Sequence, residues 1–206
     1  MSDLAFTHRF IPASAGSPGR TLLLLHGTGG DENDLVPLGR ELDPAAALLS
    51  VRGNVLENGM PRFFRRLAEG VFDEADVIRR AHELADFVGI AATRYEFDPK
   101  GVIAIGYSNG ANIAAAILLL RPEVLAGAIL FRAMGPLVPA ALPDLAHARV
   151  IILSGKQDSI VPVENAERLA AMFREAGANA TLRFEPAGHA LVSGDLAAAK
   201  EWLANL

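Results

Sequence analysis

The sequence has no cysteine among its 206 residues. Disulfides, thiolate metal sites and a cysteine nucleophile are therefore excluded, and the absence fits a reducing compartment. No stretch approaches the roughly 18 uninterrupted apolar residues that a membrane-spanning helix needs. The first residues also lack the basic start and apolar run of an export signal. We therefore expect a cytoplasmic protein without a membrane span.

Long basic runs are missing too, and the formal net charge is -5. This balance argues against nucleic acid or an anionic membrane as the main partner, because both attract clustered positive charge. With these partners disfavoured, we expect a small-molecule or acyl-carrying substrate.

The chain does contain ample apolar surface, since 51% of its residues are hydrophobic. We expect one domain over residues 1–206, because this length suits one large core. Short apolar runs that end in turn residues predict strands buried on both faces, and helical spacing of apolar residues predicts helices between them. The strands are expected at 20–27, 46–53, 101–110, 125–133, 148–156 and 180–189, and the helices at 31–42, 74–95, 110–120, 163–177 and 195–206.

This alternation predicts an α/β fold, with a mostly parallel central sheet and helices on both faces. Residues 5–13 add an expected antiparallel edge strand, and an exposed edge would permit a homodimer. In such sheets ligands bind beyond the carboxyl ends of the strands. The residues that directly follow each apolar run are therefore the candidates for a site.

One such position carries the motif GxSxG, formed by Gly106, Ser108 and Gly110. Between a strand and a helix this motif is typical of a nucleophile elbow, because the serine backbone turns so sharply that nearby side chains would clash. The alternative is a structural glycine turn. A serine hydroxyl needs a base to react at neutral pH, so the hypothesis requires partners.

His189 is the predicted base, because it follows the last expected strand and the chain order in this fold is serine, acid, histidine. His147 has only Asp144 as a preceding acid, three residues earlier on one loop. Asp158 is the predicted acid, since it follows the preceding strand and its carboxylate would orient the imidazole. The alternatives are a loop histidine without a role and an aspartate that caps the next helix.

Two backbone N–H groups should stabilise an oxyanion, and we expect them from Thr28 and Asn109. Thr28 lies in the glycine-rich loop "HGTGG", and Asn109 follows the serine. A phosphate-binding reading of this loop fails, because GxGxxG breaks at Glu32 and no GxxxxGK[ST] occurs. The acids Asp31 and Asp34 are expected at a helix amino terminus, where they complement its dipole. No metal and no cofactor are predicted.

The segments "HGTGG", "GYSNG", "GKQDSIVP" and "AGH" occur in this order across nearly the whole chain. Together they resemble the α/β-hydrolase superfamily, specifically its small, lidless phospholipase/carboxylesterase branch, which includes acyl-protein thioesterases. The segment "VRGNVLENGMPRFFRRL" is similar to that of bacterial carboxylesterases in this branch. The resemblance implies a Ser108, Asp158 and His189 triad with Thr28 and Asn109 as amide donors. Acyl-protein thioesterases usually carry Gln after the serine, so Asn109 weakens a role in protein deacylation.

We therefore expect a serine carboxylesterase that cleaves short to medium acyl esters through an acyl-enzyme. An acyl thioesterase or lysophospholipase would use the same triad, and a non-catalytic binding protein is the alternative of another class. Residues 131–147 are too short for a cap domain. Arg62, Arg65 and Arg66 attract an anionic substrate or form a solvated helix face. Candidates for an acyl pocket, or else for ordinary packing, are Met60, Phe63, Phe64, Met134, Leu137, Val138 and Leu191.

Overall fold

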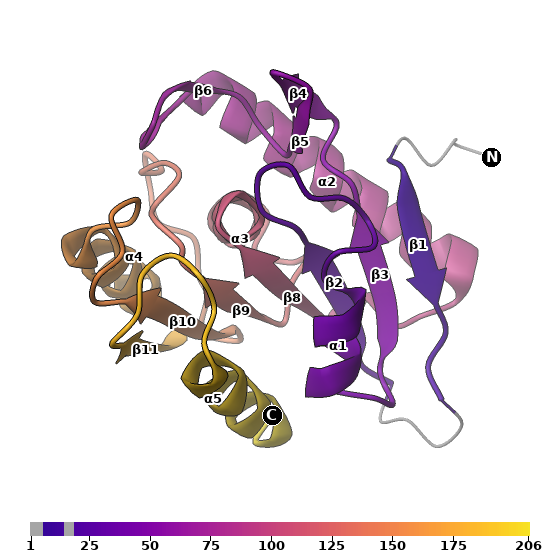
Figure 1. Ribbon diagram of the computed structural model, residues 1–206. Coiled ribbons are helices and arrows are strands. Elements are labelled where there is room, and N and C mark those ends of the chain that lie inside the picture. The colour runs from indigo at the N-terminus through magenta and orange to yellow at the C-terminus, as the bar shows by residue number, and fades with distance from the viewer. Residues whose placement is uncertain (1–5, 15–18) are drawn as a thin grey trace.

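The computed structural model describes residues 6–14 and 19–206, and a twisted seven-stranded sheet runs through its centre (Figure 1). Across the sheet the strand order is β1-β3-β2-β8-β9-β10-β11. Among the described residues of this central sheet, only the pairing of β1 with β3 is antiparallel. The strands are β1 (His8–Ile11), β2 (Thr21–Leu25), β3 (Ala47–Val51), β8 (Val102–Tyr107), β9 (Gly127–Phe131), β10 (Arg149–Gly155) and β11 (Asn179–Glu185).

This sheet confirms the predicted α/β fold and the antiparallel edge strand, although Ala5, at the start of that expected strand, lies outside the described residues. The parallel strands β2, β8 and β9 are buried almost throughout, as their continuous apolar runs predict. Their carboxyl ends meet at one edge of the sheet. The predicted triad residues follow the carboxyl ends of β8, β10 and β11.

In the described part of the chain, five α-helices cover both faces of the sheet, three on one side and two on the other. They are α1 (Val36–Leu42), α2 (Glu74–Tyr95), α3 (Asn109–Leu120), α4 (Val163–Glu175) and α5 (Ser193–Ala204), and a short 3-10 turn spans Pro99–Gly101. Residues of α2, α3 and α4 share one apolar cluster, whereas α1 and α5 contribute to the second. The helix expected at 31–42 begins only at Val36, because residues 32–35 form turns.

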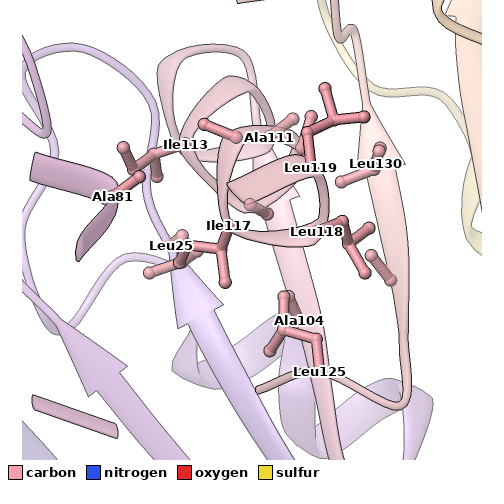
Figure 2. Packing of buried hydrophobic residues seen from close by; sticks show 14 of the residues in the cluster. Leu25, Ala81, Ala104, Ala111, Ile113, Ile117, Leu118, Leu119, Leu125 and Leu130 are labelled. Atoms are coloured by element: carbon pink, nitrogen blue, oxygen red, sulfur yellow. The ribbon is translucent and has the colours of Figure 1, made fainter. Parts of the chain in front are cut away.

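Helix α3 is the most enclosed helix of the fold, with every residue from Asn109 to Leu119 buried. Figure 2 shows its side chains between α2 and the sheet, with Ile117 near Leu25 of β2 and Ile113 near Ala81 of α2. Such a helix has no polar face to turn toward water, so its sequence is apolar all round. Its amino terminus, which follows Ser108, is therefore held in the core.

The chain between β3 and α2 forms two small antiparallel hairpins above the sheet edge (Figure 1). They pair β4 (Val55–Glu57) with β5 (Met60–Arg62) and β6 (Arg66–Ala68) with β7 (Val71–Phe72). The helix-face interpretation of the three arginines is therefore wrong. Residues 132–148 form neither helix nor strand, in keeping with the expected absence of a cap domain. No helix within residues 6–14 and 19–206 is long and apolar enough to cross a membrane.

Candidate active site

Ser108 occupies a strained turn between β8 and α3, with φ 52° and ψ -113°. Positive φ is uncommon outside glycine, and this conformation exposes the serine hydroxyl above the sheet. The two flanking positions must be glycine, because neither has room for a side chain. A Cβ on Gly106 would lie 2.5 Å from the Ala111 Cα, and one on Gly110 would lie 2.0 Å from the Leu25 carbonyl oxygen. The spacing in GxSxG thus follows from crowding against α3 and β2.

The structure brings the three predicted triad residues together in one hydrogen-bonded chain. His189 Nε2 lies 3.0 Å from Ser108 Oγ, and His189 Nδ1 lies 2.8 Å from Asp158 Oδ2. The imidazole is 20% exposed, whereas the Asp158 side chain is fully buried. In this arrangement Asp158 accepts a hydrogen bond from the Nδ1–H of His189, which leaves Nε2 to accept one from the Ser108 hydroxyl.

Asp158 is fixed by its own loop. Its Oδ1 accepts hydrogen bonds from the backbone N–H groups of Ile160 at 2.8 Å and Val161 at 3.0 Å. The helix-capping alternative does not hold, because Pro162 is the N-cap of α4 and Asp158 precedes it by four residues. His147 is exposed elsewhere on the surface, with its Nε2 2.9 Å from the Pro122 carbonyl oxygen.

The two expected oxyanion donors, Thr28 and Asn109, line one cavity with Ser108 and His189. Within the described parts of the chain, no hydrogen bond engages the backbone N–H of either residue. Both N–H groups therefore remain available to a ligand. The Thr28 hydroxyl accepts a bond of 2.6 Å from the Arg62 guanidinium, which fixes the side chain of this loop residue.

His26 supports the loop before Thr28, a role that the order-based search for a catalytic base did not suggest. Its Nδ1 donates to the Gly27 carbonyl at 2.6 Å, and its Nε2 accepts the Gly53 N–H at 3.0 Å. Burial lowers the pKa of this imidazole, and the acceptor role of Nε2 also requires the neutral form. The adjacent strand end and the glycine-rich sequence were the only signals for it.

The cavity has a volume of about 390 Å³, and both polar and apolar side chains line it. Of the seven pocket candidates only Met134 is among its lining residues. Phe63, Phe64 and Leu137 are instead packed in the core, Leu191 packs against the second apolar cluster, and Met60 and Val138 are exposed. The lining residues are Thr28, Arg62, Arg66, Glu69, Gly70, Phe72, Tyr107, Ser108, Asn109, Asn112, Arg132, Met134, Ile160, Val161 and His189.

Arg62 is only 3% exposed, and it lines the cavity together with Arg66. Both guanidinium groups pair with the single carboxylate of Glu57, at 3.1 Å and 2.8 Å. Burial and, second, the nearby Arg66 charge lower the pKa of Arg62. Arg65 points elsewhere and pairs with Asp73 at 2.8 Å.

The acids at 31–34 do not lie in the first turn of α1, so the expected interaction with its dipole is wrong. Glu32 binds the Arg52 guanidinium at 2.5 Å and 2.8 Å, and Asp31 accepts the Asn33 N–H at 2.7 Å. No group of three or more His, Asp or Glu within the described residues could hold a metal ion.

Two asparagines of α3 bind the segments at Phe63 and Met134 to the helix that follows Ser108. The Asn109 Oδ1 accepts the Phe63 N–H at 2.7 Å, and the Asn112 Oδ1 accepts the Met134 N–H at 3.0 Å. The Asn109 Nδ2 is buried without a hydrogen-bond partner within the described residues. Sequence reasoning gave a role only to the backbone of Asn109 and none to Asn112.

Comparison with known proteins matches residues 61–201 to the dienelactone hydrolase family. "Putative hydrolase MhqD" of Bacillus subtilis (strain 168) is 51% identical over 187 residues, which cover 91% of this chain and 94% of that protein. A carboxylesterase structure from Bacillus cereus is 48% identical, with a TM-score of 0.95 over 98% of this chain and 94% of that one. The structure of YahD with malic acid is 30% identical, with a TM-score of 0.90 over 97% and 98%.

These matches confirm the expected superfamily, since the agreement extends over nearly the full length in both sequence and structure. The α/β-hydrolase architecture and the predicted hydrolase class are thereby established. The chain belongs to the dienelactone hydrolase family of the α/β-hydrolase superfamily, and it is a hydrolase.

Proposed function

We propose that this protein hydrolyses carboxylic esters through an acyl-enzyme formed on Ser108. The observation that carries the proposal is the continuous chain from Asp158 through His189 to Ser108, with bonds of 2.8 Å and 3.0 Å at the wall of a cavity. A serine that only closes a turn has no need of a base aligned by a buried carboxylate.

In the proposed reaction His189 takes the Ser108 proton as Oγ attacks the ester carbonyl carbon. The Thr28 and Asn109 N–H groups donate to the oxygen as it gains charge, and Asp158 stabilises the imidazolium. His189 then gives the proton to the leaving alkoxide, which departs as the alcohol. Water attacks the acyl-enzyme with the same proton transfers, and the acid is released.

The cavity favours short acyl groups on esters with polar parts. Its volume of about 390 Å³ is modest, and Phe63 and Phe64, which sequence analysis offered as pocket walls, are in the core. Arg62 and Arg66 provide positive charge on one wall. The similarity to a Bacillus cereus carboxylesterase supports oxygen esters. Thioesters and lysophospholipids are the alternative substrates, since the same acyl-enzyme would serve them.

We also propose a cytoplasmic location, because the absence of cysteine fits a reducing compartment. The proposal also includes the pairing of two copies through an edge of the sheet. The outer strand β11 offers an edge for this pairing, since only β10 is hydrogen-bonded to it in the sheet of the described residues.

The test combines hydrolysis of p-nitrophenyl acetate with labelling by a fluorophosphonate, located by mass spectrometry. We expect labelling at Ser108 in the wild type, none in Ser108→Ala, and turnover reduced by at least about 1000-fold in Ser108→Ala and His189→Ala. His147→Ala is the matched control, because this exposed histidine lies away from the cavity and its Nε2 lies 2.9 Å from the Pro122 carbonyl oxygen. Folded wild type that neither labels nor hydrolyses would favour the non-catalytic binding protein.

A further inference from the structure

Arg132 is a fully buried arginine at the carboxyl end of β9, the strand next to the one that leads to Ser108. Its φ is 54°, a left-handed conformation that costs energy for a residue with a side chain. Its N–H donates to the Leu153 carbonyl at 2.8 Å, which holds this turn in place. Nothing in the proposed reaction uses the Arg132 guanidinium directly, so its burial and its strained backbone call for another explanation.

The guanidinium of Arg132 makes five hydrogen bonds, as many as it has N–H groups. Two of them hold the loop of His189 from both sides: Nε donates to the Gly188 carbonyl at 3.0 Å, and Nη2 donates to the Ala190 carbonyl at 2.8 Å. Nη1 donates to the Leu153 carbonyl at 3.0 Å. The other two bonds form a bidentate pair with Asp195, at 2.8 Å and 2.5 Å.

Asp195 and Tyr107 extend this arrangement along the same loop. Asp195 is fully buried, and its Oδ2 also accepts the Val192 N–H at 2.9 Å. The Tyr107 hydroxyl donates to the carbonyl oxygen of His189 itself at 3.1 Å. The carbonyl groups of residues 188, 189 and 190 therefore each have a side-chain donor, and the two donors come from the ends of β8 and β9.

A buried ion pair is a poor source of stability, because the loss of hydration offsets the attraction between the charges. An apolar pair of similar size would stabilise the fold as well. It would leave the carbonyls of Gly188 and Ala190 without donors, whereas the planar fork of an arginine spans both. The Arg132–Asp195 pair is therefore better explained by its hydrogen bonds to the loop of His189 than by a contribution to the stability of the core.

We propose that Arg132, Asp195 and Tyr107 are positioning residues that hold the His189 imidazole between Ser108 and Asp158. The inference rests on the proposed function, since it assigns these residues to the placement of the base. Loops at the ends of parallel strands have no ladder of their own, so a catalytic side chain on such a loop needs side-chain support. A displacement of about 1 Å in such a group lowers turnover by about 100-fold.

The main test is the double variant Arg132→Met with Asp195→Leu, which removes both charges and so leaves neither one buried alone. We expect the variant to fold, with kcat for p-nitrophenyl acetate lowered by about 100-fold and KM changed by less than about threefold. The proton resonance of the His189 Nδ1–H should also weaken or disappear. Wild-type kcat and an unchanged resonance in the folded double variant would overturn the proposal.

Tyr107→Phe provides a second variant in case the double variant does not fold, because it removes one oxygen and buries no charge. Loss of this single bond should lower kcat about threefold to tenfold, and an unchanged kcat would then overturn the proposal. Arg20→Met is the matched control. Its guanidinium also binds one aspartate and one backbone carbonyl, those of Asp43 and Leu203, but it does not line the cavity, so we expect wild-type turnover.

The wild type separates this inference from the proposed function. If the folded wild type does not hydrolyse esters, the proposed function fails. In that case the His189 resonance still tests the positioning role, because it depends on the Asp158 hydrogen bond and not on turnover. Its loss in the double variant would support the role, and its persistence would overturn it.

Discussion

Replacement of Asn109 by Ala separates the two roles that this residue holds. Its backbone N–H is a proposed oxyanion donor, whereas its side-chain Oδ1 accepts the Phe63 N–H at 2.7 Å and so secures the segment that carries Arg62. Its Nδ2 is buried without a partner in the described parts of the chain. Asn109→Ala removes the side-chain functions and keeps the backbone donor.

The expected loss of stability follows from the buried Phe63 N–H, which the substitution leaves without an acceptor. Such a group costs about 1 to 3 kcal/mol, and for a chain of this size that corresponds to a fall in Tm of about 2 to 12 °C. Turnover should stay within about threefold of wild type, because a lost oxyanion donor would instead lower kcat by about 100- to 1000-fold. Thermal unfolding followed by circular dichroism and ester hydrolysis measure the two effects.

Asn112→Ala is the matched control for stability, since it deprives the Met134 N–H of its acceptor in the same way. We expect a similar fall in Tm. A large loss of kcat in folded Asn109→Ala would refute the assignment of the donor to the backbone and would transfer it to the side chain. An unchanged Tm would show that the bond to Phe63 contributes nothing to stability.

Two further predictions concern His26 and Gly110. Burial lowers the pKa of His26 in the folded protein, so the unfolded chain binds a proton more readily, and stability should be lost as pH falls below about 6.5. Between about pH 7.5 and 5.5, Tm should therefore fall more in wild type than in His26→Gln. Parallel curves of Tm against pH for the two proteins would contradict this. Gly110→Ala should leave little folded protein, since its Cβ would lie 2.0 Å from the Leu25 carbonyl oxygen. Gly89→Ala is its control, because nothing lies within 4 Å in the middle of α2, and Tm should be equal or higher.

The fold was predictable because local and tertiary preferences agree in this chain. Buried parallel strands need continuous apolar runs, and the six expected runs correspond to six of the strands in the sheet. The helix expected at 74–95 begins and ends where it was predicted, with Asp73 as a side-chain N-cap. The two hairpins at 55–72 were missed, because strands of two or three residues are too short to show an alternating pattern.

The predicted triad residues were found from order along the chain, because topology places the ends of parallel strands at one edge. The pocket was not found in this way. Phe63 and Phe64 have the apolar character of an acyl pocket, but whether an aromatic side chain faces a cavity or the core depends on the local path of the backbone. A short hairpin segment carries no periodic signal for that path, so Arg62 could not be placed from sequence either.

Ser108 and Arg132 share a strained backbone conformation, which the sequence marks at Ser108 but not at Arg132. Both adopt positive φ, at 52° and 54°, and both directly follow neighbouring parallel strands. For Ser108 the flanking glycines mark the strained turn, whereas Arg132 lies between Phe131 and Ala133 without any such mark. Strain of this kind persists only where surrounding bonds over-determine the conformation. Five side-chain bonds from Arg132 provide that constraint, so the backbone strain at the end of β9 is maintained by the same contacts that hold the loop of His189.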